Sequence, residues 1–320
     1  MSKGAILAEA ESIKAELVNI RRDIHRHPEV GWHVERTASL GERVMQEHGL
    51  AVGKRVAGTG VAGLLRGGRR GKTIAIRTDM DALPIHEQRE TSYSSRTEGV
   101  MHACGHDAHV AMAMGAAMLL ARRKDRLKGN VKFILQPNEE VPPGGAHAMI
   151  EGGVLSNPKV HAIVALHVDP ILPIGQVGIR AGTVMSSTDT LTITVAGRAA
   201  HAALPHLSID AIATAARIIV GLQTIVSRQM DPMEPVVISI GTIEGGYSAN
   251  VVADRVKMVG TVRTLSPAVR RELPGMIRRV VRNVAGSAGT SHLHRRVAPA
   301  QPVSQGVDLW VGAWLCENYC

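Results

Sequence analysis

Three short segments of the chain are rich in side chains that bind metal ions in proteins. Residues 101–109 read MHACGHDAH and hold three histidines, one cysteine and one aspartate in a short loop that leads into a helical pattern. The second segment is Gln136–Glu140 (QPNEE), and the third is Leu166–Asp169 (LHVD). Cysteine and histidine suit zinc and its first-row neighbours. This density of donors predicts a metal site.

The second and third segments each follow a run that is typical of a buried strand, Val131–Leu135 and Ala162–Leu166. Taken singly, His167 would be a satisfied core histidine and the paired glutamates a solvated loop. Charge beside a buried strand is costly, however, unless it is coordinated or paired. Glu139 and Glu140 point in different directions, so one could bind a metal while the other carries a proton. Ligands of α/β sheets gather at the carboxyl ends of the strands, where we expect the three segments to converge.

The elements that would position these donors form an α/β pattern in the first half of the chain. Strand-like runs at Val61–Arg66 and Thr73–Arg77 flank a glycine-rich turn, and Val110–Ala121 is an apolar helix that we expect to be buried. The short, mostly apolar runs Val131–Leu135 and Ala162–Leu166 are typical of buried parallel strands. The first half therefore predicts a catalytic domain with a central, mostly parallel sheet.

The pattern changes near Ser186, where the order strand, helix, strand, strand, helix predicts a small α+β module with an antiparallel sheet. Its strands are expected at 191–195, 236–240 and 256–262, and its first helix at 209–226. Pro267–Val284 reads as the second helix, with Ser266 as its N-cap and proline at the first helical position.

Composition excludes several classes of protein. The net charge of +9 arises from arginines spread along 320 residues without interleaved aromatic side chains, which argues against a nucleic-acid surface. No uncharged apolar run approaches the length that crosses a membrane, and no signal peptide is recognisable, so we expect neither membrane nor nucleic acid as a partner. Cys104, Cys316 and Cys320 do not form a disulfide framework, and a reducing cytoplasm is the expected location.

Residues 58–63 (GTGVAG) match the glycine spacing of a dinucleotide-binding fingerprint, and Asp79 lies near the expected distance downstream. That motif requires a helix directly after the glycines. Leu64–Arg66 instead runs straight into Gly67 and Gly68, which leaves no room for a helix. An NAD-dependent enzyme is therefore disfavoured.

Together these residues resemble the M20 metallopeptidases, and most closely the amidohydrolase branch with hippurate hydrolase and the auxin-conjugate hydrolases. The resemblance extends from about His25 to about Val284. It rests on the following segments: His25–Glu29 (HRHPE), Arg77–Pro84 (RTDMDALP), the MHACGHD loop, QPNEE, LHV, Gly197–His206 (GRAAHAALPH), Gly245–Val252 (GGYSANVV) and Gly260–Thr264 (GTVRT).

The resemblance implies a binuclear metal centre. Cys104 would bridge two divalent ions, with His106, Glu140 and His167 as further ligands, and the donor set is compatible with Zn²⁺, Mn²⁺, Co²⁺ or Ni²⁺. Glu139 would be the general base, which takes a proton from the attacking water and returns it to the leaving amine.

For the supporting residues, the resemblance implies that Asp81 fixes a ligand or the base. It also implies that residues 186–296 form a dimerisation or lid domain. His201 would reach the active site of the partner subunit and stabilise an oxyanion there, and Asn250 and Arg263 would hold the carboxylate or carbonyl of the substrate. Without the resemblance, these last three residues would be taken for a turn residue, a turn cap and a surface charge.

The chain departs from the family pattern at Ala199–Ala200, at Val141–Pro143 and at Ala253. Family members also continue beyond the lid to complete the catalytic domain, with one more histidine ligand. We therefore expect residues 1–185 to be the catalytic domain and residues 297–320 to be an aberrant remnant of the returning segment, after a frameshift or premature stop.

The function implied is hydrolysis of the amide bond of N-acyl or N-aroyl amino acids by a homodimer with two divalent ions. The runner-up activities are those of an M20 dipeptidase or a carbamoyl-amino-acid hydrolase. A different class of hypothesis is a catalytically impaired remnant that can only dimerise.

Overall fold

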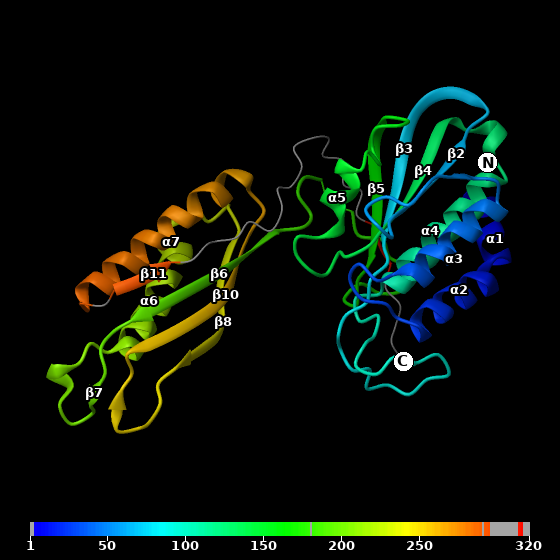
Figure 1. The fold of residues 1–320 in the computed structure, drawn as a ribbon. Helices are drawn as coiled ribbons and strands as arrows, with labels where there is room; N and C mark the ends of the chain where they lie inside the picture. Colours follow the sequence, from blue (N-terminus) through cyan, green and yellow to red (C-terminus); the bar gives the residue numbers. More distant parts are fainter. Residues whose placement is uncertain (1–2, 180, 290, 295–312, 316–320) are drawn as a thin grey trace. The chain divides into compact units, whose positions relative to one another are not determined.

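The computed structural model describes residues 3–179, 181–289, 291–294 and 313–315, and it divides into two compact units. Unit 1 comprises Met1–Gly182 with Gly306–Cys320, and unit 2 comprises Thr183–Gln305 (Figure 1). The expected aberrant remnant at 297–320 lies outside the described residues apart from 313–315, and it stays a prediction.

A six-stranded mixed sheet forms the centre of unit 1. Its strands in spatial order are β1 (Ala51–Val52), β2 (Val61–Arg66), β4 (Lys128–Gln136), β3 (Arg69–Asp79), β5 (Val160–Val168) and β12 (Ala313–Leu315). Strands β4, β3, β5 and β12 run parallel to one another, whereas β1 and β2 are antiparallel to their neighbours. The expected α/β class with a mostly parallel central sheet is thereby confirmed.

Helices cover the sheet on both faces, as Figure 1 shows for α2 to α4 on one side and α5 on the other. The helices of unit 1 are α1 (Lys3–Ser12), α2 (Lys14–Arg26), α3 (Glu35–Glu47), α4 (His106–Ala121) and α5 (Gly145–Glu151). Alternate residues of β4 enter different cores, because Phe133 lies in the core with α2 to α4 whereas Ile134 packs against Met149 of α5. Burial on both faces explains why Val131–Leu135 of this strand is apolar apart from Lys132.

Strands β2 and β3 are not neighbours, although they flank one glycine-rich turn, because β4 lies between them. β3 begins at Arg69, earlier than the expected Thr73, and it pairs with β4 from Lys128 onward. The backbones approach so closely here that a side chain on Gly71 or Gly129 would collide with the opposing chain. The rejection of a dinucleotide fingerprint is confirmed, since β2 begins at Val61 within the glycine motif, where the fingerprint requires a turn into a helix.

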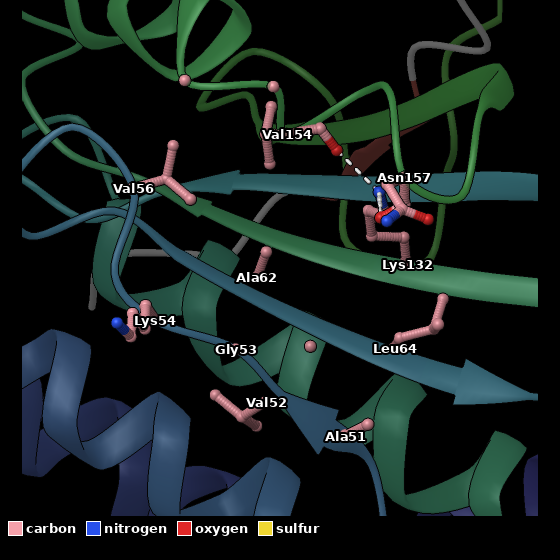
Figure 2. Close-up of a pocket in the computed structure, with 13 residues that line it drawn as sticks. Ala51, Val52, Gly53, Lys54, Val56, Ala62, Leu64, Lys132, Val154 and Asn157 are labelled. Atoms are coloured by element: carbon pink, nitrogen blue, oxygen red, sulfur yellow. Dashed lines mark hydrogen bonds between the residues drawn. The ribbon is translucent and has the colours of Figure 1, made fainter.

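Lys132 is a charged side chain that β4 buries beside a hollow of about 300 Å³ (Figure 2). Its Nζ donates three hydrogen bonds, at 2.7–3.1 Å, to the carbonyl oxygens of Val154, Asn157 and Pro158. All three donors of the ammonium group are thereby used. The lysine ties β4 to the loop between α5 and β5, and the hollow contains none of the metal-type donors.

Unit 2 has a four-stranded antiparallel sheet covered by two helices. The strands in spatial order are β11 (Ser291–His294), β6 (Ser187–Ala196), β10 (Arg255–Thr264) and β8 (Val236–Gly245), and the helices are α6 (Ala211–Thr224) and α7 (Pro267–Ser287). A separate pair, β7 (Ala200–His201) and β9 (Val251–Val252), lies beyond the sheet. The Ser266 hydroxyl accepts from the Val269 N–H, which confirms the expected N-cap.

Within the described residues, Ala211–Gln229 is the one helical segment long and apolar enough to cross a membrane. Its side chains Ala215, Ile218 and Leu222 are fully buried in the core of unit 2. Packing against the sheet therefore accounts for the apolar stripe of this helix.

Replacing Lys132 by methionine leaves three buried carbonyl oxygens without their donor. We expect Lys132→Met to lower the free energy of unfolding by about 2 kcal/mol. Urea unfolding followed by circular dichroism measures this change. The control is Lys54→Met, an exposed lysine at the mouth of the same hollow, which should change stability by less than about 0.5 kcal/mol. Equal effects of the two variants would contradict the assigned role of Lys132.

Candidate metal centre

The three donor segments converge at the carboxyl ends of the parallel strands of unit 1. Asp79 ends β3, Gln136 ends β4 opposite it, and His167 lies near the end of β5. Cys104 and His106 stand at the start of α4. These donors form three overlapping groups, and within each group the ligand atoms lie within 4.8 Å of one another. The groups are Cys104, His106 and His167; His106, Glu139 and Glu140; and Asp79, His106 and His109.

A left-handed glycine shapes the loop that carries Cys104 and His106. Gly105 has a φ of 78°, and a Cβ at this position would collide with the side chain of Val168. Glycine adopts this conformation without penalty. The tight turn lets α4 begin at His106, so that the positive end of the helix faces the cluster.

Asp81 fixes both glutamates through their backbone. Its two carboxylate oxygens accept the N–H groups of Glu139 and Glu140, at 2.9 Å and 3.0 Å. The backbone carbonyl of Asp81 also accepts the Nδ1–H of His106, at 2.7 Å. One residue thus orients three side chains of the cluster. Burial favours the neutral form of Asp81, but the hydrogen bonds outweigh it and lower its pKa.

Asn138 gives the glutamate loop its shape. It has a φ of 51°, in the left-handed region that asparagine tolerates better than most residues. Its N–H donates to the carbonyl of Gly31, and its side-chain amide donates to the carbonyl of Val141. The buried asparagine therefore turns the chain so that Glu139 and Glu140 follow it into the cluster.

The cluster fits a cation because it concentrates anionic donors around buried atoms that lack hydrogen bonds. His106 Nε2 and Glu140 Oε1 are both buried without a hydrogen-bond partner among the described residues, and they lie 3.7 Å apart. Burial lowers the pKa of His106, yet the neighbouring Asp81, Cys104 and Asp79 raise it to about 11. Such a field favours positive charge at this point, and a metal ion would supply it.

Cys104 and His167 form the other half of the cluster. Sγ of Cys104 is 3.4 Å from Nε2 of His167. The Nδ1–H of His167 donates to the carbonyl of Val168 at 2.7 Å, which directs Nε2 towards the thiol. A histidine held this way at Nδ1 presents the lone pair of Nε2 to a metal.

Glu139 differs from Glu140 in exposure, since 42% of its side chain is accessible against 18% for Glu140. Burial of the carboxyl group and the charge of Asp79 raise the pKa of Glu139. A raised pKa suits a group that must accept and release a proton near neutrality. The more exposed glutamate is therefore the one placed to meet a substrate.

Asp107, in the first turn of α4, accepts hydrogen bonds from two side chains of α2. His25 Nδ1–H donates to its Oδ2 at 2.9 Å, and Arg21 donates to the same oxygen at 3.1 Å. Burial raises the pKa of Asp107, but the bond from His25 and the charges of His102 and Arg21 lower it to about 2. His25 and Asp107 both lie within motifs that carry the family resemblance, and the resemblance implied a role for neither. Their wide separation in the chain hid the pairing.

Unit 2 holds three expected site residues, the catalytic His201 and the substrate-binding Asn250 and Arg263, and it brings the first two together. His201 in β7 pairs with Val251 in β9, and the carbonyl of Asn250 accepts the N–H of Ala202. Both His201 and Asn250 are exposed. Arg263 lies towards the other end of β10, eight residues from Arg255, which corresponds to roughly 25 Å of strand. Within this unit the structure does not bring Arg263 to the other two residues.

The family model for peptidase family M20/M25/M40 matches residues 75–263. The chain belongs to this family. It is 41% identical to the N-acetylcysteine deacetylase of Bacillus subtilis over 280 residues, covering 87% of this chain and 73% of the relative. It is 37% identical to the N-acyl-L-amino acid amidohydrolase of Geobacillus stearothermophilus over 295 residues, covering 92% and 79%.

A solved M20 structure shares the fold. The Bacillus subtilis YXEP protein, described as a dinuclear metal-binding peptidase, matches with a TM-score of 0.78 and 37% identity, over 91% of this chain and 75% of that chain. The resemblance drawn from the motifs is confirmed, and the chain is a hydrolase of the M20 family.

Asp81 accepts two backbone N–H groups with its two carboxylate oxygens. In Asp81→Asn, an NH₂ group replaces one of these oxygens, so one backbone N–H faces another donor. We expect its affinity for Mn²⁺ or Zn²⁺ to fall about 10- to 100-fold. Isothermal titration calorimetry on protein stripped with a chelator measures this change. Asp125→Asn, an exposed aspartate between α4 and β4, is the matched control and should bind like the unaltered protein. Undiminished affinity in Asp81→Asn would show that the two bonds do not position the ligands.

Proposed function

We propose that this enzyme hydrolyses the amide bond of N-acyl or N-aroyl amino acids, releasing a carboxylic acid and a free amino acid. The observation that carries the proposal is that His106 lies both in a group with Cys104 and His167 and in a group with Glu139 and Glu140, at the carboxyl ends of the strands. The amidohydrolase and deacetylase names of relatives at 37–41% identity support this substrate class.

Two divalent cations are proposed as cofactors, with Cys104, His106, Glu140 and His167 as their ligands. The mixed sulfur, nitrogen and oxygen donors suit Zn²⁺ or Mn²⁺, and Co²⁺ and Ni²⁺ are compatible. When bound, such cations lower the pKa of water and polarise the scissile carbonyl.

The residues of the chain supply the proton transfers and the orientation. Glu139 takes a proton from the attacking water at its carboxylate and returns it to the nitrogen of the leaving amine. Asp81 keeps the Glu139 backbone fixed while this carboxylate acts, because it holds the N–H of that residue.

We further propose a homodimer formed through unit 2, in which His201 stabilises an oxyanion in the partner's active site. β8 is an edge strand of its sheet, and Val237 and Ile243 on this strand are about half exposed. Val220 of α6 is 68% exposed. An open strand edge beside exposed apolar side chains favours pairing with a second copy. Asn250 and Arg263 are proposed to hold the carboxylate or carbonyl of the substrate.

A cytoplasmic location is proposed from the chemistry of the thiol. Cys104 must remain reduced to bind metal, and it is a free cysteine. A reducing compartment preserves such a thiol.

Glu139→Gln removes the proposed base while it retains the shape of the side chain. We expect amine release from N-acetyl, N-benzoyl and indoleacetyl amino acids, with Mn²⁺ or Zn²⁺ added, to fall about 10²- to 10⁴-fold. Glu98→Gln, an exposed glutamate in the loop before the metal-binding segment, is the control and should keep full turnover. Full turnover in Glu139→Gln would contradict the assigned base.

The same substrate panel separates the alternative functions. Preference for dipeptides or N-carbamoyl amino acids would assign the enzyme to the dipeptidase or carbamoyl-amino-acid hydrolase activity. Absence of turnover from folded, metal-loaded protein would instead support a remnant that only dimerises.

A further inference from the structure

His109 is buried within the cluster, yet both of its ring nitrogens are already engaged. Its Nδ1–H donates to Oδ1 of Asp79 at 2.6 Å. The backbone N–H of Val168 donates to its Nε2 at 2.9 Å. Because Nε2 accepts a hydrogen bond, the proton of the neutral ring resides on Nδ1. His109 therefore has one defined tautomer and no lone pair left for a metal ion, although it lies in a group of possible ligands.

The Val168 N–H that His109 accepts lies beyond the part of β5 that pairs with β3, although Val168 still pairs with β12 on the other side. Pairing between β3 and β5 ends at Arg77 and Ala165, so His167 and Val168 extend past the last paired residues of β3. His109 reaches this extension from the first turns of α4. It supplies an acceptor for the Val168 N–H where β3 no longer pairs with β5.

Val168 connects His109 to an expected metal ligand. The N–H of Val168 is held by His109, and its carbonyl accepts the Nδ1–H of His167 at 2.7 Å. The two imidazole rings also contact each other, with centroids 4.6 Å apart. The position of the Val168 backbone thus sets the direction of His167 Nε2, which faces Cys104.

The other end of this chain of hydrogen bonds is anchored across two strands. Asp79 receives a hydrogen bond from Arg77 at 2.7 Å through its second carboxylate oxygen. Arg77 donates a further bond to the side-chain carbonyl of Gln136, at the end of β4. Both Asp79 and His109 are 2% exposed, so water does not compete for these bonds.

We propose that His109 is a positioning residue that aims His167 at the metal centre. It acts through a relay from Gln136, Arg77 and Asp79 to the backbone of Val168. The inference rests on the proposed metal-dependent function, because the relay ends on a proposed ligand. Groups that hold metal ligands in this way typically change metal affinity 10- to 100-fold when they are removed.

Two substitutions separate the bonds of His109. Asparagine retains a donor near the position of Nδ1 but does not reach the Val168 N–H. Glutamine retains an acceptor near the position of Nε2 but gives up the bond to Asp79. We expect His109→Asn to weaken Co²⁺ binding about 10- to 100-fold and to change the Co²⁺–thiolate absorption band, with His109→Gln closer to the unaltered protein.

The measurement is a Co²⁺ titration of metal-free protein, followed by the visible and near-ultraviolet spectrum, with thermal unfolding of each metal-free variant alongside. His48→Gln, a half-buried histidine at the end of α3, is the control and should leave the spectrum unchanged. A lower melting temperature with an unaltered Co²⁺ spectrum and affinity in His109→Asn would overturn the proposal, because a purely structural role predicts that pattern. Equal effects of the asparagine and glutamine substitutions would overturn it too.

The titration also keeps this inference apart from the proposed function. If the unaltered protein binds no Co²⁺ or shows no thiolate absorption, the proposed metal centre fails and the inference fails with it. If the unaltered protein binds Co²⁺ and His109→Asn binds it identically, only the inference fails.

Discussion

Anionic side chains gathered at the carboxyl ends of three strands are the constraint on which unit 1 depends. Asp79 and Asp81 are nearly inaccessible to water, and Glu140 lies beside Asp81. Bringing such groups together costs free energy in both desolvation and mutual repulsion. His106 and Arg77 offset part of this cost, and divalent cations would offset the remainder. Positive charge is therefore stabilising at the carboxyl ends of these strands.

The supporting residues position the metal-type donors by fixing the backbone that carries them. Asp81 holds two consecutive N–H groups, Asn138 turns the chain before them, and Gly105 allows α4 to start beside Val168. Each contact defines the direction of a ligand through the main chain. This arrangement limits movement of the donors, which favours a rigid site over one that forms only when a cation arrives.

Much of this arrangement could be predicted from the sequence. Apolar runs identified the strands that carry the donors, and the density of His, Cys and carboxylate side chains marked the cluster. The Ser266 cap was visible because serine followed by proline is a local signal. The order of β2, β4 and β3 was not, since strand neighbours are set by pairing between distant residues. The roles of His109 and Asp79 also escaped prediction, because a tautomer depends on partners that lie about 30 and 60 residues away in the chain. The distance of Arg263 from His201 and Asn250 within unit 2 could not be predicted either, because family motifs do not show how far apart folding places their residues.

The proposed function requires two divalent cations at the carboxyl ends of the parallel strands of unit 1. Crystals of the protein grown with Mn²⁺ and measured for anomalous scattering would test it most directly. We expect two anomalous peaks per chain, bounded by Cys104, His106, Glu140 and His167, with none bonded to His109. A single peak, no peak at these strand ends, or a cation coordinated by His109 would contradict this expectation.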